Sequence, residues 1–533
     1  MKRLVPFAAL FALLFIGSSA AVTHASSRST SSSSSKSDST LEFSGWIPYW
    51  ATGKGTSDAD AHLSQFTEIN PFGYTVKQDG TLFDAMNVND PNWKNLFADA
   101  RKQGVKVVPT VMWSDTGSIY NVLSNPVSRA QHIQSIVNAV KQNGFDGVDI
   151  DYEGKSAETK DSFAAFLGEL SAALNKADKN LILDCTIEAR EPLAARYSGT
   201  PPANIEYAND LPSINKYCDR VRLMTYDQQT ADLQLNKEHS DELYAPIADS
   251  AWVEKVVNYM AEDIDKSKMV IGVATYGAEY QAMTTQDGKG FVYTKLEAFN
   301  PQYGVTTAQQ YGITPERNDA GELSFSYVPK EQTSLLPTNS VLSRLAPRGT
   351  SSANLAAAGA LAYSQKNSRQ APVTFLTWSD AGAIKDKAEL AQKLGVAGIA
   401  IFKIDGGEDT AMWDDLADVA KPNMNPKMSR VTTAPVSTVA TTPIVPSTTP
   451  TVSTTTTLPA ATAAAFTTDL EFGMDGADVL HLQNLMTTKG YMTATPNGHF
   501  GPATKAAVTA WQKASGLPAT GYFGPLSRAK IAA

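Results

Sequence analysis

The chain has few of the residues that mark several classes of protein. Among its 533 residues only two are cysteines, and Lys and Arg form no run beyond the first few positions. Because nucleic acids are bound through clustered basic side chains, this distribution and a formal net charge of −9 argue against a nucleic-acid partner. The pair Gly406-Gly407 lacks the strand and helix that surround a phosphate-binding loop. We therefore expect no cofactor and no metal.

The first 25 residues have the pattern of a signal peptide. Lys2 and Arg3 give a positive start, residues 4–16 are apolar, and residues 23–25 (Thr-His-Ala) form a cleavage site. The apolar run is short for a membrane span, so we expect cleavage and no membrane contact afterwards, with an uncleaved anchor as the alternative. Either way, the bulk of the chain is expected outside the cytoplasm.

The two cysteines, Cys185 and Cys218, leave their redox state open. A disulfide is allowed outside the cytoplasm. The two residues fall at different depths of two candidate strands, however, which favours free buried thiols.

Two stretches of biased composition divide the rest of the chain. Residues 26–40 are almost entirely Ser, and residues 423–466 are rich in Thr and Pro with hardly a charge, so we expect two linkers that bury no core. They leave a long segment, 41–422, and a short one, 467–533. Apolar residues make up 42% of the whole chain, which is enough for a large core, and the length of the chain predicts two or more domains.

Strand patterns alternate with helical patterns in the long segment, as in a parallel α/β fold. Eight such strands suggest a (β/α)8 TIM barrel. Residues 278–375 are too many for one loop and contain short β-like runs, which predicts an α+β insertion after the seventh strand. The predicted strands are 43–50, 68–76, 105–113, 145–154, 180–189, 220–227, 268–276 and 396–403.

The segment 145–154 (Phe-Asp-Gly-Val-Asp-Ile-Asp-Tyr-Glu-Gly) carries four acids. Asp149, Asp151 and Glu153 are two residues apart, so on a strand they share one face while apolar residues take the other. Burying a row of like charges favours the protonated form of one member, and we expect Glu153, at the strand end, to hold a proton. A calcium loop would instead need an acid at its twelfth position, which here is Lys160.

This stretch resembles the active-site signature of glycoside hydrolase family 18, Asp-x-x-Asp-x-Asp-x-Glu, at Asp146, Asp149, Asp151 and Glu153. The resemblance covers roughly residues 41–420. It implies a (β/α)8 barrel with this motif on the fourth strand. It also implies an enzyme that cleaves β-linkages at N-acetylglucosamine in chitin, peptidoglycan or glycans.

The resemblance gives each acid a role. Glu153 would protonate the glycosidic oxygen as general acid. Asp151 would orient the substrate's acetamido group, whose oxygen attacks the anomeric carbon to give an oxazolinium intermediate with net retention. Asp149 would share a proton or a hydrogen bond with Asp151. Asp146 is three residues before Asp149, so on a strand it lies on the other face. We count it among the substrate-binding candidates, in a supporting, structural role.

The sixth strand ends in Met224-Thr225-Tyr226-Asp227, which is similar to the Met-x-Tyr-Asp motif of the same family. The resemblance implies that Tyr226 hydrogen-bonds the acetamido carbonyl, that Asp227 contacts sugar hydroxyls or the catalytic acid, and that Met224 lines the pocket floor. Glu188 and Arg190, which end the fifth strand, are further candidates for the substrate groove.

The eighth strand departs from the family pattern. The family usually ends this strand with a Trp that floors the sugar subsite, and Phe402 stands at that place here. Trp378 or Trp413 would compensate for the smaller ring, and Trp50 and Trp113 also stand at strand ends. Each of these aromatic residues is either a platform for a sugar or part of the core.

Residues 467–533 carry a second resemblance. They contain Leu482-Gln483, Gly498-His499-Phe500-Gly501-Pro502 and Trp511-Gln512, and they are similar to the small three-helix peptidoglycan-binding domain. The usual Phe before Gln is Trp511 in this chain. The alternative is a generic helical bundle with no ligand.

The two resemblances together imply a secreted, cell-wall-associated glycosidase that cuts peptidoglycan at N-acetylglucosamine, and we expect a monomer. Two alternatives stay open: a chitinase anchored to the cell wall, and a non-catalytic wall- or chitin-binding lectin. Relatives that only bind sugars commonly lose the catalytic acid, and Glu153 is present here.

Overall fold

The computed structural model describes most of the two segments that were expected to fold. The predicted signal peptide and Ser-rich linker lie outside the described residues, as does nearly all of the Thr/Pro-rich linker. None of the helices within the described part is long and apolar enough to cross a membrane. The described residues are 41–240, 242–329, 337–419, 466, 470, 476–498, 500–517, 519 and 521–532.

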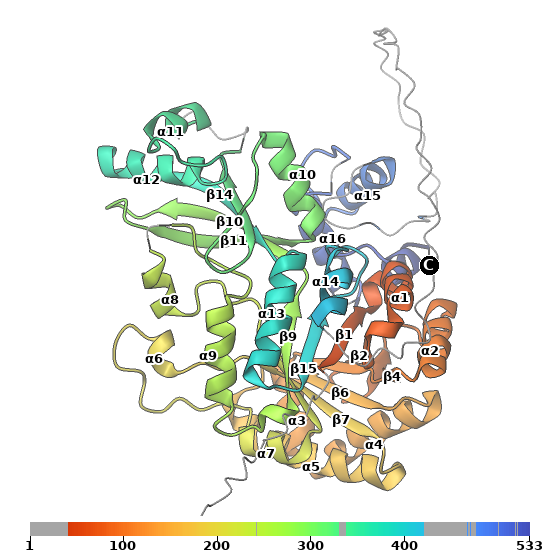
Figure 1. Cartoon of the computed structure of the whole chain (residues 1–533). Helices are drawn as coiled ribbons and strands as arrows, with labels where there is room; N and C mark the ends of the chain where they lie inside the picture. Colours follow the sequence, from red (N-terminus) through yellow and green to blue (C-terminus); the bar gives the residue numbers. More distant parts are fainter. Residues whose placement is uncertain are drawn as a thin grey trace, which may run out of the picture. The chain divides into compact units, whose positions relative to one another are not determined.

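Eight parallel strands form a closed barrel, which confirms the predicted (β/α)8 fold (Figure 1). Each strand pairs with the next one in the chain, and the last pairs back with the first. A short strand, β3 (Leu82–Asp84), adds to β2 in the antiparallel sense. The barrel strands are β1 (Glu42–Pro48), β2 (Glu68–Val76), β5 (Thr110–Trp113), β6 (Gly147–Tyr152), β7 (Ile182–Glu188), β8 (Arg220–Met224), β9 (Met269–Ala274) and β15 (Gly398–Phe402).

The third predicted strand, 105–113, is broken in two. Its first part is β4 (Lys106–Val107), which also pairs with β2, and its second part is β5. Pro109 lies between them, and a proline has no N–H to donate to a ladder. Its carbonyl still accepts a hydrogen bond from Asp149 N (2.9 Å), so the strand keeps its place beside β6.

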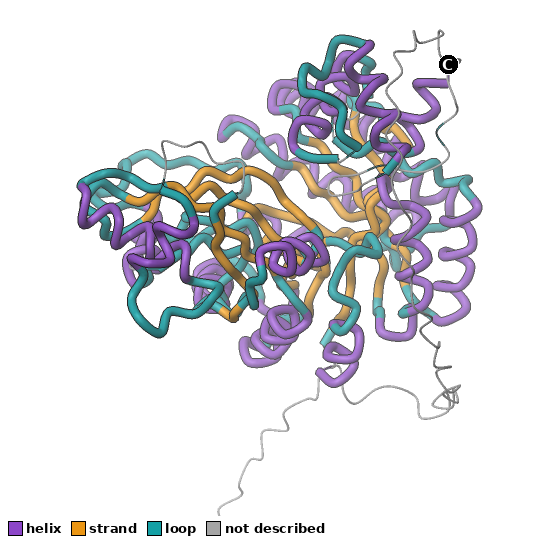
Figure 2. Tube along the Cα trace, turned by 90° about the horizontal axis from the view of Figure 1, so that it is seen from above, coloured by secondary structure: helices purple, strands orange, loops and turns teal. Residues whose placement is uncertain are grey.

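Helices cover the outside of the barrel (Figure 2). Several begin at an acidic or amide N-cap followed by proline and end at a glycine with positive φ, for example Asp90 and Gly104 around α2, and Asn125 and Gly144 around α4. The barrel helices are α1 (Thr52–Ala61), α2 (Pro91–Gln103), α3 (Thr116–Ser124), α4 (Pro126–Asn143), α5 (Lys160–Ala177), α6 (Leu193–Arg196), α7 (Leu211–Tyr217), α8 (Leu233–Glu238), α9 (Ser250–Met260), α13 (Ala381–Leu394) and α14 (Met412–Val419).

The two faces of β6 divide as the sequence predicts. Val148, Ile150 and Tyr152 are buried against the surrounding helices, and the Tyr152 ring stacks on Phe166 of α5 at 5.5 Å between centroids. The acids of β6 therefore take the face that points into the barrel.

The predicted insertion folds as an antiparallel sheet with helices, and Figure 1 shows β10, β11 and β14 side by side with α12 beside them. The strand order is β11-β10-β14-β13-β12, and β14 leads back to the barrel through α13. The sheet spans 277–378, slightly more than the predicted range. Its elements are β10 (Gly277–Thr284), β11 (Phe291–Phe299), α10 (Pro301–Tyr311), β12 (Glu316–Arg317), β13 (Leu323–Tyr327), α11 (Asn339–Leu345), α12 (Leu355–Asn367) and β14 (Pro372–Trp378).

The two cysteines form a disulfide, which corrects the preference for free thiols. Cys185 lies in β7 and Cys218 follows the end of α7, and their Cα atoms are 6.0 Å apart. Neighbours of Cys185 on both sides, Asp184 and Thr186, point into the barrel, so Cys185 points out towards the helices. We expected the two cysteines at different depths of two strands. That comparison does not apply, because Cys218 follows a helix and is not part of a strand.

The terminal segment forms three helices, α15 (Ala477–Thr488), α16 (Pro502–Ala514) and α17 (Pro525–Ala532). Trp511 is buried at its centre, 5.8 Å from the Phe523 ring between centroids. Two glutamines make equivalent contacts: Gln483 Oε1 accepts a hydrogen bond from Gly498 N, and Gln512 Oε1 accepts one from Gly521 N, both at 2.8 Å.

Candidate active site

The candidate site lies at the carboxyl ends of the barrel strands, where the ends of β6, β8 and β15 bring the predicted residues together. Asp151 pairs in register with Met112 on one side and with Thr186 on the other. Glu153 follows β6 directly, and its backbone N–H donates to Trp113 O (2.8 Å). This is the end of the barrel at which (β/α)8 enzymes carry their active sites.

Asp149 lies one layer below the mouth of the barrel and is completely buried. Its Oδ2 accepts hydrogen bonds from Trp46 Nε1 (3.0 Å) and Thr110 Oγ1 (2.7 Å), and its Oδ1 accepts one from Thr186 Oγ1 (2.8 Å). No hydrogen bond joins Asp149 to Asp151 in the described part of the chain, contrary to the expectation, because other donors occupy both Asp149 oxygens.

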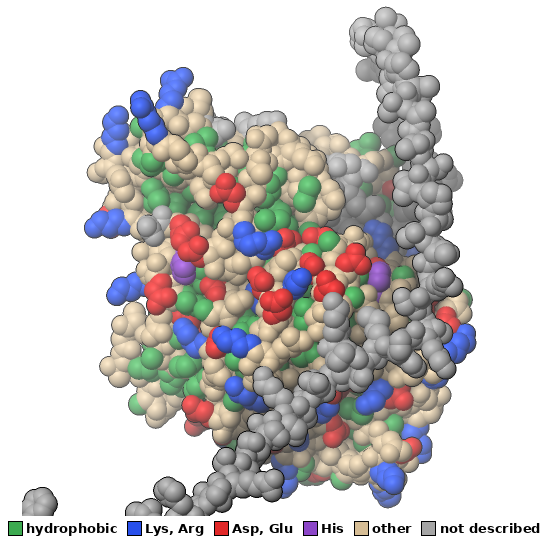
Figure 3. All heavy atoms as spheres, viewed as in Figure 1, with side chains coloured by type: hydrophobic (Ala, Val, Ile, Leu, Met, Phe, Trp, Pro, Cys, Tyr) green, Lys and Arg blue, Asp and Glu red, His purple; other side chains and the backbone are tan. Residues whose placement is uncertain are grey.

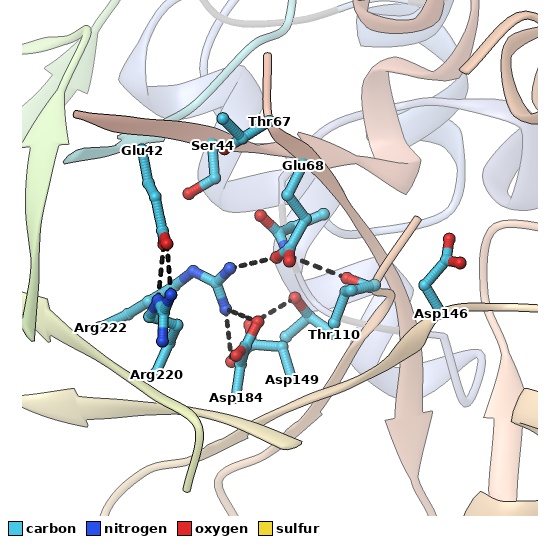
Figure 4. A network of polar contacts seen from close by, with 12 residues as sticks. Glu42, Ser44, Thr67, Glu68, Thr110, Asp146, Asp149, Asp184, Arg220 and Arg222 are labelled. Atoms are coloured by element: carbon cyan, nitrogen blue, oxygen red, sulfur yellow. Dashed lines mark hydrogen bonds and ion pairs between the residues drawn. The ribbon is translucent and has the colours of Figure 1, made fainter. Parts of the chain in front are cut away.

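A buried arginine neutralises this layer (Figure 4). Arg222 of β8 has a side chain that is 2% exposed, and it donates to Asp184 Oδ2 (2.7 Å) and to Glu68 Oε1. Its Nη1 is also 3.6 Å from Asp149 Oδ1. Burial and the charges of Glu68 and Asp149 outweigh the pull of Arg222 and hold the pKa of Asp184 well above its usual range. Three acids thus share one guanidinium, and the raised pKa of Asp184 favours its uncharged form.

Asp151 and Glu153 lie at the mouth itself and both favour protonation. Burial, with the charges of Glu153 and Asp149, raises the pKa of Asp151 well above its usual range. Burial and the neighbouring charges of Glu188 and Asp227 raise the pKa of Glu153, which is half-buried. Asp151 Oδ1 is buried without a hydrogen-bond partner among the described residues. We expected Glu153 alone to favour the protonated form. Instead, both Asp151 and Glu153 favour it.

Tyr226, after β8, faces these acids. Burial raises its pKa well above the usual range, and the next causes are the charges of Asp151 and Glu153. Its ring stacks on Phe402 at 5.5 Å between centroids. Because its pKa is raised, the hydroxyl remains a hydrogen-bond donor at any ordinary pH.

Met224 and Asp227 flank this tyrosine in different ways. Met224 is the last residue of β8 and is half-buried on the same inward face as Arg222. Asp227 is exposed and forms an ion pair with Lys295 of β11 (3.1 Å). The insertion therefore reaches the mouth of the barrel through this pair.

Phe402 occupies the floor position expected at the end of β15. It is half-buried and contacts four aromatic rings, among them Trp46 (5.9 Å between centroids) and Phe72 (6.3 Å). Trp50, just after β1, is also half-buried and packs edge-on against Phe72. Both residues stay candidates for a sugar platform.

Three tryptophans belong to the core and are corrected as platform candidates. Trp113 is 2% exposed and packs against Tyr152 on the helix side of the barrel, since it is one residue out of phase with the inward-facing Met112. Trp378 is 1% exposed between Phe299 and Phe325 of the insertion, and Trp413 is buried beneath α1.

Asp146 lies at the amino end of β6, away from the other substrate-binding candidates. Its Oδ2 accepts a hydrogen bond from Val107 N (2.8 Å) at the amino end of β6, the opposite end from Glu153. In Figure 4 it lies apart from the charged network. It holds β4 and β6 together.

Glu188 and Arg190 are held by the loop that follows β7. Asn209 Nδ2 donates to Glu188 Oε2 (2.7 Å), and Arg190 donates to Asn209 O (3.1 Å) and stacks over Tyr207 at 3.8 Å. The charge of Glu188 raises the pKa of Glu153, so Glu188 faces the mouth. Both residues stay candidates for the groove.

Two cations of the site, Lys155 and Arg222, were missed in the sequence. Arg222 stands between Val221 and Leu223, and a charge inside an apolar strand is a sign of a buried ion pair. Lys155 follows Glu153 by two residues, where a lysine looks like any exposed loop residue, yet its side chain is 1% exposed. No sequence signal distinguishes it.

Comparison with known families agrees with this geometry. The profile of the glycosyl hydrolases family 18 matches residues 45–407, which is more than half of the chain, so the chain belongs to this family. A second profile, described as a putative peptidoglycan binding domain, matches residues 475–531. Both predicted resemblances are confirmed.

Individual relatives are distant. Chitinase B of Serratia marcescens is 25% identical over 326 residues, 56% of this chain and 61% of that protein. The uncharacterized glycosylase YvbX of Bacillus subtilis is 22% identical over 212 residues, 40% of this chain and 54% of that protein. The matched regions thus span little more than half of these curated relatives.

Two solved structures share the fold. The spore cortex-lytic enzyme SleL of Bacillus megaterium QM B1551 has a TM-score of 0.51 at 18% identity, over 72% of this chain and 74% of that one. A chitinase of Chromobacterium violaceum has a TM-score of 0.51 at 17% identity, over 72% and 100%. At such identities the likeness establishes the barrel alone.

Proposed function

We propose that the chain is an exported glycosidase that cleaves β-linkages at N-acetylglucosamine in peptidoglycan, with the substrate's acetamido group as nucleophile. The observation that carries the proposal is the row of Asp149, Asp151 and Glu153 at the mouth of the barrel, with Tyr226 facing it from the end of β8. Membership of family 18 supports the reaction class.

Glu153 is the general acid of this reaction. Its raised pKa favours the protonated form that a general acid needs, and it is half-buried at the end of β6, where it is able to meet the glycosidic oxygen. As the glycosidic C–O bond breaks, the leaving oxygen takes that proton. The ionised Glu153 then accepts a proton from the water that opens the intermediate.

Asp151 and Tyr226 act on the acetamido group. The acetamido oxygen bonds to the anomeric carbon, and positive charge develops on the ring that forms. A carboxyl oxygen of Asp151 accepts a hydrogen bond from the acetamido N–H, and the Tyr226 hydroxyl donates to the acetamido oxygen. Two inversions at the anomeric carbon give net retention, and no carboxylate of the chain has to act as nucleophile.

The terminal domain supports peptidoglycan as the polymer, because its family is described as peptidoglycan-binding. The Cys185–Cys218 disulfide supports export, since disulfides persist mainly in oxidising compartments. Acidic side chains gather across the middle of the face in Figure 3, over α13 and α14, where Asp414 and Asp415 begin α14, and such a face suits no nucleic acid. We propose a secreted, wall-associated monomer.

Product analysis on purified peptidoglycan and on chitin oligomers tests the proposal. The variants are Glu153→Gln and, as a matched control, Glu158→Gln, an exposed acid five residues further on. Wild type and the control should release muropeptides with new N-acetylglucosamine reducing ends, and Glu153→Gln should release none.

The other outcomes separate the alternatives. Cleavage of chitin alone would reduce the terminal domain to an anchor and replace peptidoglycan with chitin as the substrate. If neither polymer is cleaved while wild type and Glu153→Gln both still bind, the protein is a lectin.

A further inference from the structure

A buried lysine stands two residues after the candidate catalytic acid. The Lys155 side chain is 1% exposed, and its Nζ donates to the carbonyl oxygen of Tyr152, the last residue of β6. The Nζ also lies 4.8 Å from the centre of the Phe163 ring and 3.9 Å from Glu188 Oε2. A lysine buried this deeply retains its charge only where acids compensate it.

The surroundings of Glu153 are otherwise acidic. Burial and the acids at the ends of β7 and β8 raise the pKa of Glu153, and the charge of Lys155 lowers it. The charge of Lys155 also opposes the raised pKa of Asp151. The titratable groups that face Glu153 are Asp151 from β6, Glu188 from β7, Tyr226 and Asp227 from beyond β8, and Lys155 from its own loop.

We propose that Lys155 is a positioning residue for the glycosidic reaction: its buried Nζ, bonded to the Tyr152 carbonyl and 3.9 Å from Glu188 Oε2, holds the turn that carries Glu153 and places an ammonium group among the acids of the mouth. This inference rests on the proposed role of Glu153. Burial lowers the pKa of Lys155, and the charges of Glu188, Asp151 and Glu153 oppose that shift, so Lys155 acts through these acids and through the turn that it ties to Tyr152.

The sign of the effect follows from the charges. Without the ammonium group the ionised form of Glu153 loses its nearest counter-charge, so Glu153 keeps its proton to a higher pH. Removal of the negative charge at Glu188 has the opposite effect. A purely structural role for Lys155 would lower activity or stability at every pH but would not move either limb of the pH profile.

The test is the pH dependence of kcat/KM on a soluble chitin oligomer, measured with the full chain. We compare wild type with Lys155→Met, Lys155→Arg and Glu188→Gln. The control is Lys160→Met, since Lys160 is 49% exposed and pairs with Asp210 on the surface. Lys155→Met should move the alkaline limb up by about half a unit to one unit, Lys155→Arg should restore it, and Glu188→Gln should move it down.

An alkaline limb that stays in place in folded Lys155→Met overturns the inference. If Lys155→Met does not fold, the pH profiles of Lys155→Arg and Glu188→Gln are used instead. An alkaline limb that does not move in Glu188→Gln would also overturn the inference. Failure of the proposed role of Glu153 gives a different result: Glu153→Gln would then remain active, whether or not substitutions at Lys155 move the pH profile.

Discussion

The guanidinium of Arg222 lies 3.6 Å from Asp149 Oδ1 inside the barrel, and both side chains are almost completely excluded from solvent. Three hydrogen bonds also hold the Asp149 carboxyl in place, one layer below Asp151. Asp151 and Glu153, whose pKa values are both raised, are the acids of this row that favour the protonated form.

Replacement of Arg222 by Met should be far more damaging than replacement of Asp184 by Asn. Arg222→Met leaves Asp149 and Glu68 buried without a counter-charge, which costs about 3–5 kcal/mol of unfolding free energy. Asn has nearly the shape of Asp and carries no charge. Asp184→Asn therefore resembles the uncharged form that the raised pKa of Asp184 favours, and it should cost less than about 1 kcal/mol of unfolding free energy. Urea unfolding at pH 7 measures both values. Equal losses would mean that Asp184 is ionised in its pair with Arg222.

Removal of the Tyr226 hydroxyl should slow the chemical step. We expect Tyr226→Phe to lower kcat by about 10- to 100-fold with little change in KM, because the hydroxyl acts on the acetamido oxygen as charge develops. Steady-state kinetics on chitin oligomers measure the effect. Tyr280→Phe is the control, since Tyr280 is buried in the insertion sheet and its hydroxyl has no hydrogen-bond partner among the described residues. A similar loss in both variants would contradict a direct role for Tyr226.

Loss of the disulfide should destabilise the barrel without altering the site. Cys185 and Cys218 are 33 residues apart. A bridge across a loop of this size lowers the conformational entropy of the unfolded chain, which stabilises the folded state by about 3–4 kcal/mol. The double variant Cys185→Ala with Cys218→Ala should show this loss in urea unfolding, and wild type should match it in reducing buffer. An unfolding curve that reducing agent leaves unchanged would contradict the bridge.

Replacement of Asp58 by Asn should stabilise the protein at neutral and alkaline pH. Burial and a hydrogen bond with the neighbouring Glu408 carboxyl raise the pKa of Asp58 to about 8. The unfolded Asp58 ionises near pH 4, so stability falls between pH 4 and pH 8 as the folded state resists ionisation.

Asp58→Asn removes this loss. At about 1.4 kcal/mol per pKa unit the gain at pH 8 has an upper limit of about 5 kcal/mol, and it should disappear below pH 4. Thermal unfolding across this pH range measures it. Asp60→Asn, at an exposed position of the same helix, serves as the control and should change little. A gain that does not depend on pH would assign the effect to something other than ionisation.

The regular part of the fold could be predicted from the sequence. Strand β2 has the predicted bounds, and the apolar and acidic faces of β6 follow from a period of two. Each of these patterns lies within one segment, so no knowledge of its neighbours was needed.

The errors concern relations between segments. Trp113 differs from Met112 by one position, and only the pairing with β6 reveals which of the two points into the barrel. The disulfide depends on how the end of α7 meets β7, and the burial of Lys155 depends on a turn at Gly154 with positive φ. Register, helix placement and turn geometry are tertiary properties that local periodicity does not contain.

The disulfide also determines what a protease would leave of this part of the barrel. Residues 189–210 lie between the two cysteines and form a long surface connection that carries Arg190 and Asn209, the latter holding Glu188. A cut within this connection would break the polypeptide but not the molecule, since the Cys185–Cys218 bond still joins the two fragments. After such a cut, the fragment that ends beyond β7 and the fragment that contains β8 would remain one molecule, because the disulfide joins them.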